Sequence, residues 1–221
     1  MRAAPMSKYD LVVFDLDGTI LDTSVGILSA VKHTICQMDY AMVEDDILST
    51  FIGPPIQDSF ARVYGSSGEV LQEIATIFRE QYKSKDLLKA MPYEGIYEVL
   101  QELLDRNIVM AVATYKREDY ALTLLKHFQF DRYATIMHGA DHWNRLKKQN
   151  IIQMCIEEAG IADYQRVVMV GDTLHDEQGA KLLGIDFIGV SYGFGFKTAE
   201  ELAMAHAVGF ANKPLDLLSM I

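Results

Sequence analysis

The chain has 221 residues, half of them hydrophobic and 23% charged, which is ordinary for a soluble globular protein. This length allows one large domain, or one domain that carries an insertion. The formal net charge of -11 argues against nucleic-acid binding, which needs a basic face, and against attachment to an anionic membrane surface.

The two cysteines and the N-terminal segment indicate the cellular compartment of the protein. Cys36 and Cys155 form no Cys-x-x-Cys pair, and we expect both to be buried thiols on helices in a reducing cytosol. The first eight residues lack the apolar core of a signal peptide, and no stretch is long and apolar enough to span a bilayer. We therefore expect a cytoplasmic protein, whose translation could begin at Met1 or at Met6.

The first predicted strand ends in acidic residues. Residues 11–14 are all apolar, which is typical of a fully buried strand in a parallel sheet. Asp15 and Asp17 follow at alternate positions, where two nearby carboxylates are costly unless a cation compensates them. Gly18 then allows a sharp turn and a close approach to a ligand. Open α/β sheets bind their ligands at such strand ends.

Further strand-like runs alternate with helical periodicity along the chain. Between residues 96 and 104, for example, the apolar residues are spaced so that they lie on one face of a helix. The alternation predicts an α/β fold with a doubly wound parallel sheet. The candidate strands are 10–14, 108–113, 134–137, 167–170 and 187–190.

One region interrupts this alternation. From residue 24 to about residue 91 no strand pattern occurs, and helical patterns follow one another, separated by glycine- and proline-containing turns. We therefore predict a core domain formed by residues 1–20 and 92–221, with residues 21–91 inserted as a helical domain.

Three more polar segments follow apolar runs. Thr114 offers a hydroxyl donor, although a threonine after a strand often only caps a helix. Lys147 and Lys148 precede a helical pattern, and taken locally they are better explained as a solvated pair. Asp172 follows the run 167–170 after Gly171, and Asp176 lies one helical turn later. Because Mg²⁺ prefers oxygen ligands, acids from two strand ends could hold one ion between them.

In order and spacing, these four segments resemble the motifs of the haloacid dehalogenase superfamily, which begin with Asp-x-Asp-Gly-Thr on the first strand. The resemblance covers essentially the whole chain and implies a Rossmann-like core with an inserted helical cap. It implies that Asp15 is a nucleophile that becomes phosphorylated and that Asp17 is the general acid and base. The family often has Asn after the Ser or Thr of its second motif, where this chain has Tyr115.

The same resemblance assigns the remaining site residues. Thr114 and a lysine, for which Lys148 matches better than Lys147, would bind phosphate together with the main chain of Leu16, Asp17 and Gly18. Mg²⁺ would be the cofactor. Its ligands would be Asp15, the main-chain carbonyl of Asp17, Asp172 and Asp176, the last either directly or through water.

The chain is most similar to the phosphoglycolate-phosphatase-like group, which has a small helical cap. The cap loop Ile52, Gly53, Pro54, Pro55 and Ile56 would then set specificity, and we expect hydrolysis of a small phosphate monoester. A phosphomutase resembling beta-phosphoglucomutase is an alternative, but such enzymes have Lys and Arg where this loop is apolar. An inorganic pyrophosphatase and a catalytically silent binding protein of the same fold are further alternatives; the presence of Asp15 and Asp17 argues against the last.

Overall fold

A computed structural model describes residues 7–141, 145–196 and 198–221. Met6, the alternative start of translation, therefore lies outside the described residues. The chain divides into two compact units, one formed by Met1–Leu21 with Pro92–Ile221 and the other by Asp22–Met91. We call them the core unit and the inserted unit and describe each by itself. Among the described residues, no helix has both the length and the apolar character needed to cross a membrane.

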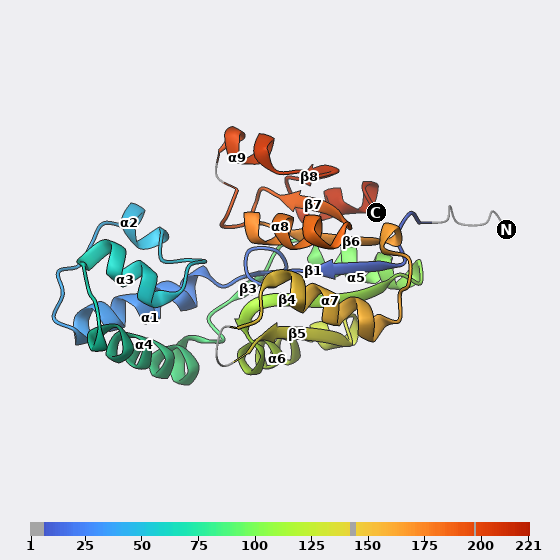
Figure 1. The fold of residues 1–221 in the computed structure, drawn as a ribbon. Helices are drawn as coiled ribbons and strands as arrows, with labels where there is room; N and C mark the ends of the chain where they lie inside the picture. Colours follow the sequence, from blue (N-terminus) through green and yellow to red (C-terminus); the bar gives the residue numbers. More distant parts are fainter. Residues whose placement is uncertain (1–6, 142–144, 197) are drawn as a thin grey trace. The chain divides into compact units, whose positions relative to one another are not determined.

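A six-stranded sheet organises the core unit (Figure 1). Its strand order is β5-β4-β1-β6-β7-β8, and every neighbouring pair is parallel. The strands are β1 Leu11–Phe14, β4 Val109–Arg117, β5 Ile136–Ala140, β6 Val167–Gly171, β7 Asp186–Val190 and β8 Gly209–Ala211. The chain builds outward from β1 to β5 and then returns to the other side of β1 with β6. The predicted doubly wound sheet is confirmed, and its topological switch point lies beside β1.

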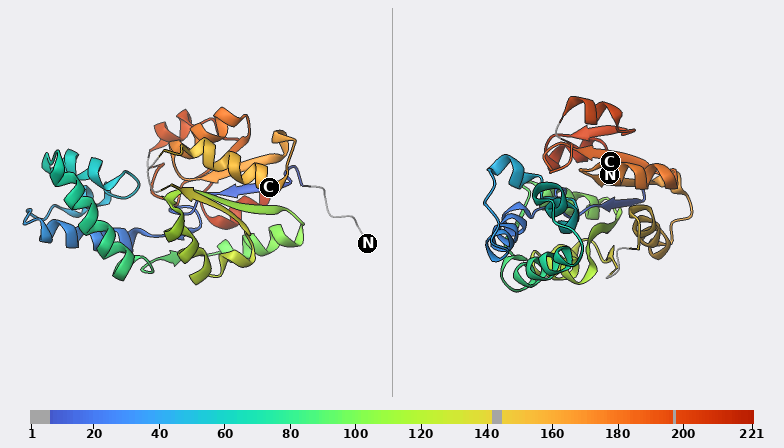
Figure 2. Two further views of the ribbon diagram at one scale, coloured as in Figure 1. Left: turned by 60° about the horizontal axis from the view of Figure 1, so that its bottom comes forward. Right: turned by 60° about the vertical axis from the view of Figure 1, so that its left-hand side comes forward.

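Helices cover both faces of this sheet. Figure 2 shows α7 and α8 on one face, with α5 and α6 on the other. The helices are α5 Ile96–Asp105, α6 Glu118–His127, α7 Lys148–Ala159, α8 Leu174–Leu183 and α9 Ala199–Met204, with short 3₁₀ turns at Phe130–Arg132, Tyr164–Arg166 and Pro214–Ser219. Leu11 and Val13 alternate along β1 and pack in one buried cluster with Ile151 and Ile152 of α7. The run at 11–14 is apolar throughout because both faces of β1 are buried.

Three details differ from the sequence-based expectation. The edge strand β8 was not predicted, since three residues that include a glycine give too short a pattern. Strand β4 continues to Arg117 instead of ending near Ala113, and its register with β5 shifts between those two residues. Cys36 is exposed, which corrects the expectation of two buried thiols, whereas Cys155 is buried.

The inserted unit is helical. It contains α1 Ser24–Gln37, α2 Asp45–Ser49, α3 Ile56–Tyr64, α4 Glu69–Gln81 and a π-helical turn, Tyr82–Asp86. Its own apolar cluster gathers Val31 and Ile35 of α1, Phe60 of α3 and Ile74 of α4. The short strands β2 Leu21–Asp22 and β3 Met91–Pro92 form a separate two-stranded sheet.

A buried carboxylate fastens the last turn of the inserted unit. Asp86 is fully buried, and its Oδ1 accepts a hydrogen bond from the Ser29 hydroxyl at 2.9 Å. Its Oδ2 accepts one from the Gln81 amide at 2.9 Å, and the Lys89 ammonium lies 2.6 Å from Oδ1. Burial alone would raise the pKa of Asp86, but the bonds from Lys89, Gln81 and Ser29 together hold it below its ordinary value. The charged carboxylate is thus the stable form.

Replacing Asp86 with Ala is expected to destabilise the inserted unit by about 2 kcal/mol, because two polar side chains lose their buried acceptor. The lowered pKa means that this contribution is present above a pH of about 4 and is lost as the pH falls. Urea unfolding of the two proteins at pH 7 and pH 3 measures both effects. Asp45→Ala is the matched control. Asp45 is 97% exposed, and its Oδ1 lies 3.8 Å from Nζ of Lys32, which is too far for a hydrogen bond. Equal unfolding free energies for wild type and Asp86→Ala at pH 7 would contradict the expectation.

Candidate functional site

The polar residues predicted from the sequence gather at one edge of the core sheet. Asp15 directly follows β1, Thr114 lies near the end of β4, and Asp172 directly follows β6. These three strands are neighbours, and parallel strands all end at the same edge. The switch point between β1 and its neighbours therefore brings together residues that are far apart in the sequence.

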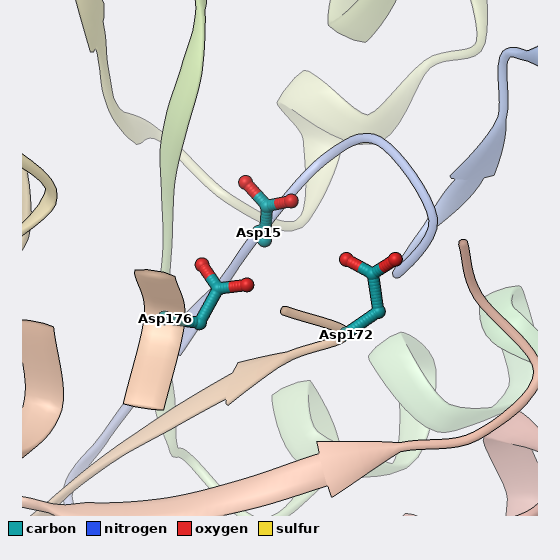
Figure 3. Close-up of side chains that lie close together, drawn as sticks. All are labelled: Asp15, Asp172 and Asp176. Carbon is teal, nitrogen blue, oxygen red and sulfur yellow. The ribbon is translucent and has the colours of Figure 1, made fainter. Parts of the chain in front are cut away.

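Three carboxylates form the centre of the site (Figure 3). Asp15, Asp172 and Asp176 lie close together, and one oxygen of each lies within 4.8 Å of the others. Their side chains are shielded from solvent, with relative exposures of 6%, 0% and 1%. Three buried acids at this separation repel one another strongly and need compensating positive charge.

Lys148 supplies part of that compensation. It is the first residue of α7, is 3% exposed, and places its Nζ 2.6 Å from an oxygen of Asp15 and 2.6 Å from an oxygen of Asp176. The neighbouring Lys147 is exposed, so the structure brings Lys148 and not Lys147 to the acids. Gly179 of α8 allows this approach, because a Cβ there would lie 3.2 Å from Cγ of Lys148 and 2.9 Å from Cδ1 of Ile152.

The protonation equilibria reflect the surplus of acids. Burial raises the pKa of Asp15 above its ordinary value, although Lys148 opposes the shift. Burial also raises the pKa of Asp172, with Asp15 and Asp176 adding to it. Burial alone would lower the pKa of Lys148, but the two carboxylates raise it overall, so the lysine stays charged. One ammonium against three carboxylates leaves a formal charge that a single divalent cation would neutralise.

Asp172 shows most directly that the acids fit a cation. Its Oδ2 accepts hydrogen bonds from the main-chain N–H of Phe194 at 2.6 Å and of Gly195 at 3.1 Å. Its Oδ1 is buried and has no hydrogen-bond partner among the described residues. One oxygen is thus fixed by the loop after β7, while the other makes no hydrogen bond to a described residue in a side chain that lies close to Asp15 and Asp176. Carboxylate oxygens are the ligands that hard divalent cations prefer.

The loop that holds Asp172 was not predicted to belong to the site. The glycine- and aromatic-rich segment 192–196 follows the last candidate strand, 187–190, and none of its residues was assigned to the site. Its contribution comes from main-chain N–H groups, which any residue except proline can supply. The alternation of Gly193, Phe194 and Gly195 was the one signal, because small residues allow the backbone to approach a side chain closely.

Asp176 is oriented by the start of its own helix. Its Oδ2 accepts hydrogen bonds from the N–H and the hydroxyl of Thr173, at 3.0 and 2.6 Å. Thr173 is the N-cap of α8, so this is the reciprocal arrangement of a capping box. The remaining oxygen, Oδ1, is the one that contacts Lys148. Local helix capping therefore sets the direction of a carboxylate in the site.

A tight turn follows Asp15. The carbonyl of Leu16 accepts hydrogen bonds from the N–H groups of Ile20 and Leu21, and the N–H of Gly18 donates to the Leu21 carbonyl at 2.8 Å. The Gly18 N–H is thus used within the turn, and its predicted contact with phosphate stays a prediction. The glycine is required for another reason. Its φ is +82°, and a Cβ there would lie 2.2 Å from Oδ2 of Asp172.

Replacing Gly18 with Ala is expected to cost at least about 2 kcal/mol more stability than replacing Gly160 with Ala. Both glycines have a left-handed φ, but a Cβ at Gly160 would meet nothing within 4 Å. The difference isolates the collision with Asp172 from the backbone strain that both alanines share. Urea unfolding of the two variants measures it, and equal destabilisation would show that the turn relaxes freely.

Thr114 and Asp17 complete the set. Thr114 is 1% exposed, and its hydroxyl oxygen accepts from the N–H of Lys116 at 3.1 Å, so it does not cap α6, whose N-cap is Arg117. Asp17 is more exposed than Asp15, and its Oδ1 lies 3.2 Å from Nζ of Lys116. Lys116 was not predicted as a site residue, because the extension of β4 that carries it to Asp17 could not be seen in the sequence.

The predicted cap residues all belong to the inserted unit. Ile56 is 8% exposed and lies in that unit's apolar cluster with Phe60, so its side chain is engaged in the packing of the unit. Gly53 and Pro54 are exposed, and Ile52 is partly exposed. Their predicted contact with substrate stays a prediction.

Comparison with known proteins agrees with this architecture. The family model described as haloacid dehalogenase-like hydrolase matches residues 12–190. A 5'-nucleotidase of Pseudomonas aeruginosa is 32% identical over 207 residues, covering 93% of this chain and 91% of that protein. A phosphoglycolate phosphatase of Agrobacterium fabrum is 33% identical over 200 residues, covering 88% and 84%. A crystal structure of a phosphatase from Clostridium difficile, described as putative, aligns with a TM-score of 0.89 at 30% identity, covering 97% of this chain and 99% of that one.

The match extends over both units, and the described acids and lysine lie within the matched residues. The family match therefore covers most of the chain and includes the buried carboxylate cluster at the switch point of the doubly wound sheet. The chain belongs to the haloacid dehalogenase-like hydrolases.

Proposed function

We propose that the protein is a Mg²⁺-dependent phosphatase that hydrolyses a small phosphate monoester through an aspartyl-phosphate on Asp15. The buried group of Asp15, Asp172, Asp176 and Lys148 carries the proposal. It combines a carboxylate nucleophile with an excess of negative charge that suits a divalent cation. The similar 5'-nucleotidase and phosphoglycolate phosphatase are named for the hydrolysis of phosphate monoesters, which supports the same reaction here.

The covalent chemistry is assigned to Asp15 and Asp17. An oxygen of Asp15 attacks phosphorus, and the bond from phosphorus to the leaving oxygen breaks. Asp17, protonated at this stage, gives its proton to the leaving alcohol. Asp17 then takes a proton from the water that attacks the aspartyl-phosphate, which releases inorganic phosphate and restores Asp15. Asp17 lies two positions after Asp15, within the tight turn, and its side chain is 23% exposed to solvent.

The phosphoryl oxygens are assigned to donors around Asp15. Lys148 contributes its ammonium, already 2.6 Å from the nucleophile. Thr114 contributes its hydroxyl proton, since its oxygen is occupied as an acceptor by the N–H of Lys116. The main chain of Leu16 and Asp17 follows the nucleophile directly, and Gly18 shapes the turn that presents it. Such donors stabilise the charge on the transferring group.

The residues that would hold Mg²⁺ are Asp15, the main-chain carbonyl of Asp17, and Asp172, with Asp176 acting directly or through water. Bound there, the ion supplies charge neutralisation for the nucleophile and the phosphoryl oxygens. The unpartnered Oδ1 of Asp172 is the feature of the structure that favours this assignment most strongly. Chelation is expected to remove the activity.

For the substrate we propose a small phosphorylated metabolite similar to phosphoglycolate, handled in the cytoplasm. The apolar loop from Ile52 to Ile56 offers no cation for a second phosphate, which disfavours the phosphomutase alternative. Inorganic pyrophosphate is the remaining alternative substrate.

Hydrolysis of p-nitrophenyl phosphate with and without Mg²⁺ tests the reaction. The expected result is release of nitrophenol that requires Mg²⁺ and stops when a chelator is added. A subsequent panel of phosphoglycolate, 5'-nucleotides, sugar phosphates, bisphosphates and pyrophosphate identifies the substrate class. Absence of turnover on every member of the panel would overturn the proposal in favour of a binding protein.

Replacing Ile52 with Lys is expected to shift the preference from monophosphates to bisphosphates by about tenfold in kcat/KM, because the loop would gain the cation that it lacks. Activity on p-nitrophenyl phosphate should change little. The panel of kcat/KM values for both proteins measures the shift.

Val70→Lys serves as the matched control for this substitution. Val70 is 40% exposed on α4. A lysine at this position adds the same charge to the same unit without altering the loop. An Ile52→Lys ranking identical to that of the control would show that the loop does not contact substrate.

A further inference from the structure

Tyr115 occupies a junction of three elements at the proposed site. It follows Thr114 on β4 and is 40% exposed. Its hydroxyl oxygen accepts a hydrogen bond of 2.9 Å from the main-chain N–H of Lys148. Its ring lies 5.5 Å from that of His175 on α8, at 81°, in edge-to-face contact. One side chain thus connects β4 with the starts of α7 and α8.

The hydrogen bond satisfies a group that a helix cannot satisfy for itself. The first N–H groups of an α-helix have no intrahelical acceptor, and Lys148 is the first residue of α7. The side chain of Asn150 accepts from the N–H of Lys147, one residue earlier. Tyr115, which lies on β4, provides the acceptor for the next N–H, that of Lys148. This hydrogen bond therefore ties the start of α7 to β4, the strand that also carries Thr114.

The same tyrosine also contacts the far end of the Lys148 side chain. The Nζ lies 5.7 Å from the centre of the Tyr115 ring, within the range of a cation–π contact. A lysine side chain has several rotatable bonds, so a fixed backbone alone does not fix its ammonium. With Tyr115 at both ends and Gly179 against its stem, Lys148 has little freedom to leave Asp15 and Asp176.

We propose that Tyr115 is a positioning residue that holds Lys148 against Asp15 and Asp176. The proposal rests on the proposed function, in which Lys148 stabilises the transferring phosphoryl group. In this role Tyr115 acts through Lys148. Displacing a catalytic group by about 1 Å lowers a rate severely, so a loosened lysine reduces kcat more than it alters KM.

Tyr115→Phe is the primary variant, because it removes the acceptor for the Lys148 N–H and keeps the ring. The expected result is a fall in kcat of about tenfold with no more than about a threefold rise in KM. Tyr97→Phe is the control. It removes another tyrosine hydroxyl in the core unit, one that donates to the Phe128 carbonyl at 2.7 Å, and should leave kcat unchanged. An unchanged kcat in Tyr115→Phe would overturn the proposal.

A double-mutant cycle with Lys148→Met separates positioning from a general effect on folding. The affinity for inorganic phosphate in the presence of Mg²⁺, measured by calorimetry, provides a readout that does not need turnover. Tyr115→Phe should weaken phosphate binding about threefold in the wild-type background and by less than about twofold once Lys148 is replaced. Equal weakening in both backgrounds would show that Tyr115 does not act through Lys148.

The two proposals fail in different ways. Wild-type protein that turns over none of the substrates contradicts the proposed function, whereas the phosphate titrations still test Tyr115. If Lys148→Met leaves both phosphate affinity and kcat unaltered, the role of Lys148 is wrong and that of Tyr115 falls with it. Active wild type with an unaffected Tyr115→Phe variant removes the positioning role alone.

Discussion

Asp15→Asn is expected to lower kcat by roughly 10³-fold or more while the protein remains folded. An amide oxygen is a poor nucleophile, so the covalent step of the proposed reaction cannot proceed. The substitution is close to isosteric, and Lys148 keeps its second partner, Asp176. Phosphate release from p-nitrophenyl phosphate at saturating substrate and Mg²⁺ measures the loss, and thermal unfolding verifies the fold.

Asp10→Asn is the control for this measurement. Asp10 lies just before β1 and pairs with Arg166, so the substitution makes the same chemical change at the opposite end of the strand. Its kcat should match that of the wild type. Residual turnover in Asp15→Asn within tenfold of this control would exclude Asp15 as the nucleophile.

Asp172→Asn is expected to raise the Mg²⁺ concentration needed for half-maximal activity by about 100-fold. The asparagine oxygen can still accept from the N–H groups of Phe194 and Gly195, so the loop keeps its anchor. The other position then carries an amide nitrogen in place of the unpartnered Oδ1, and donor hydrogens repel a cation. Activity as a function of Mg²⁺ gives the requirement, and calorimetric titration of Mg²⁺ gives the affinity without turnover.

The exposed Asp163 provides the matched substitution, Asp163→Asn, at a residue that only caps a 3₁₀ turn. Its Mg²⁺ requirement should equal that of the wild type. If the requirement of Asp172→Asn does not differ from this control, the assignment of Asp172 as a metal ligand is wrong.

The acids of the site could be predicted because each follows an apolar run. Asp15 and Asp172 both end strands that are buried on two faces, and a carboxylate at that point contrasts with everything before it. Lys148 could be assigned only by its order among the other motifs, since a local pair of lysines has no distinguishing pattern. The structure separates the pair through burial, with Lys148 beside the acids and Lys147 in solvent.

The features that escaped prediction depend on distances that no local pattern encodes. The contact between Lys116 and Asp17 requires β4 to extend past Ala113, and strand ends are poorly defined by hydropathy. The hydrogen bonds from Phe194 and Gly195 to Asp172 come from the main chain, which carries no signature of residue type. Ile56 was assigned to substrate because of its neighbours in the loop, yet helical periodicity also places it on the buried face of α3.

The position of β1 in the sheet has a consequence for how the protein folds. Leu11 pairs with Val109 on one side and with Val167 on the other, so the strand nearest the N-terminus acquires its neighbours from distant parts of the chain. Such non-local pairing slows folding, because a long loop must be closed before any contact forms. During synthesis the apolar strand that precedes Asp15 is made early and paired late. Until β6 has been made, one edge of β1 stays unpaired and open to association with other chains.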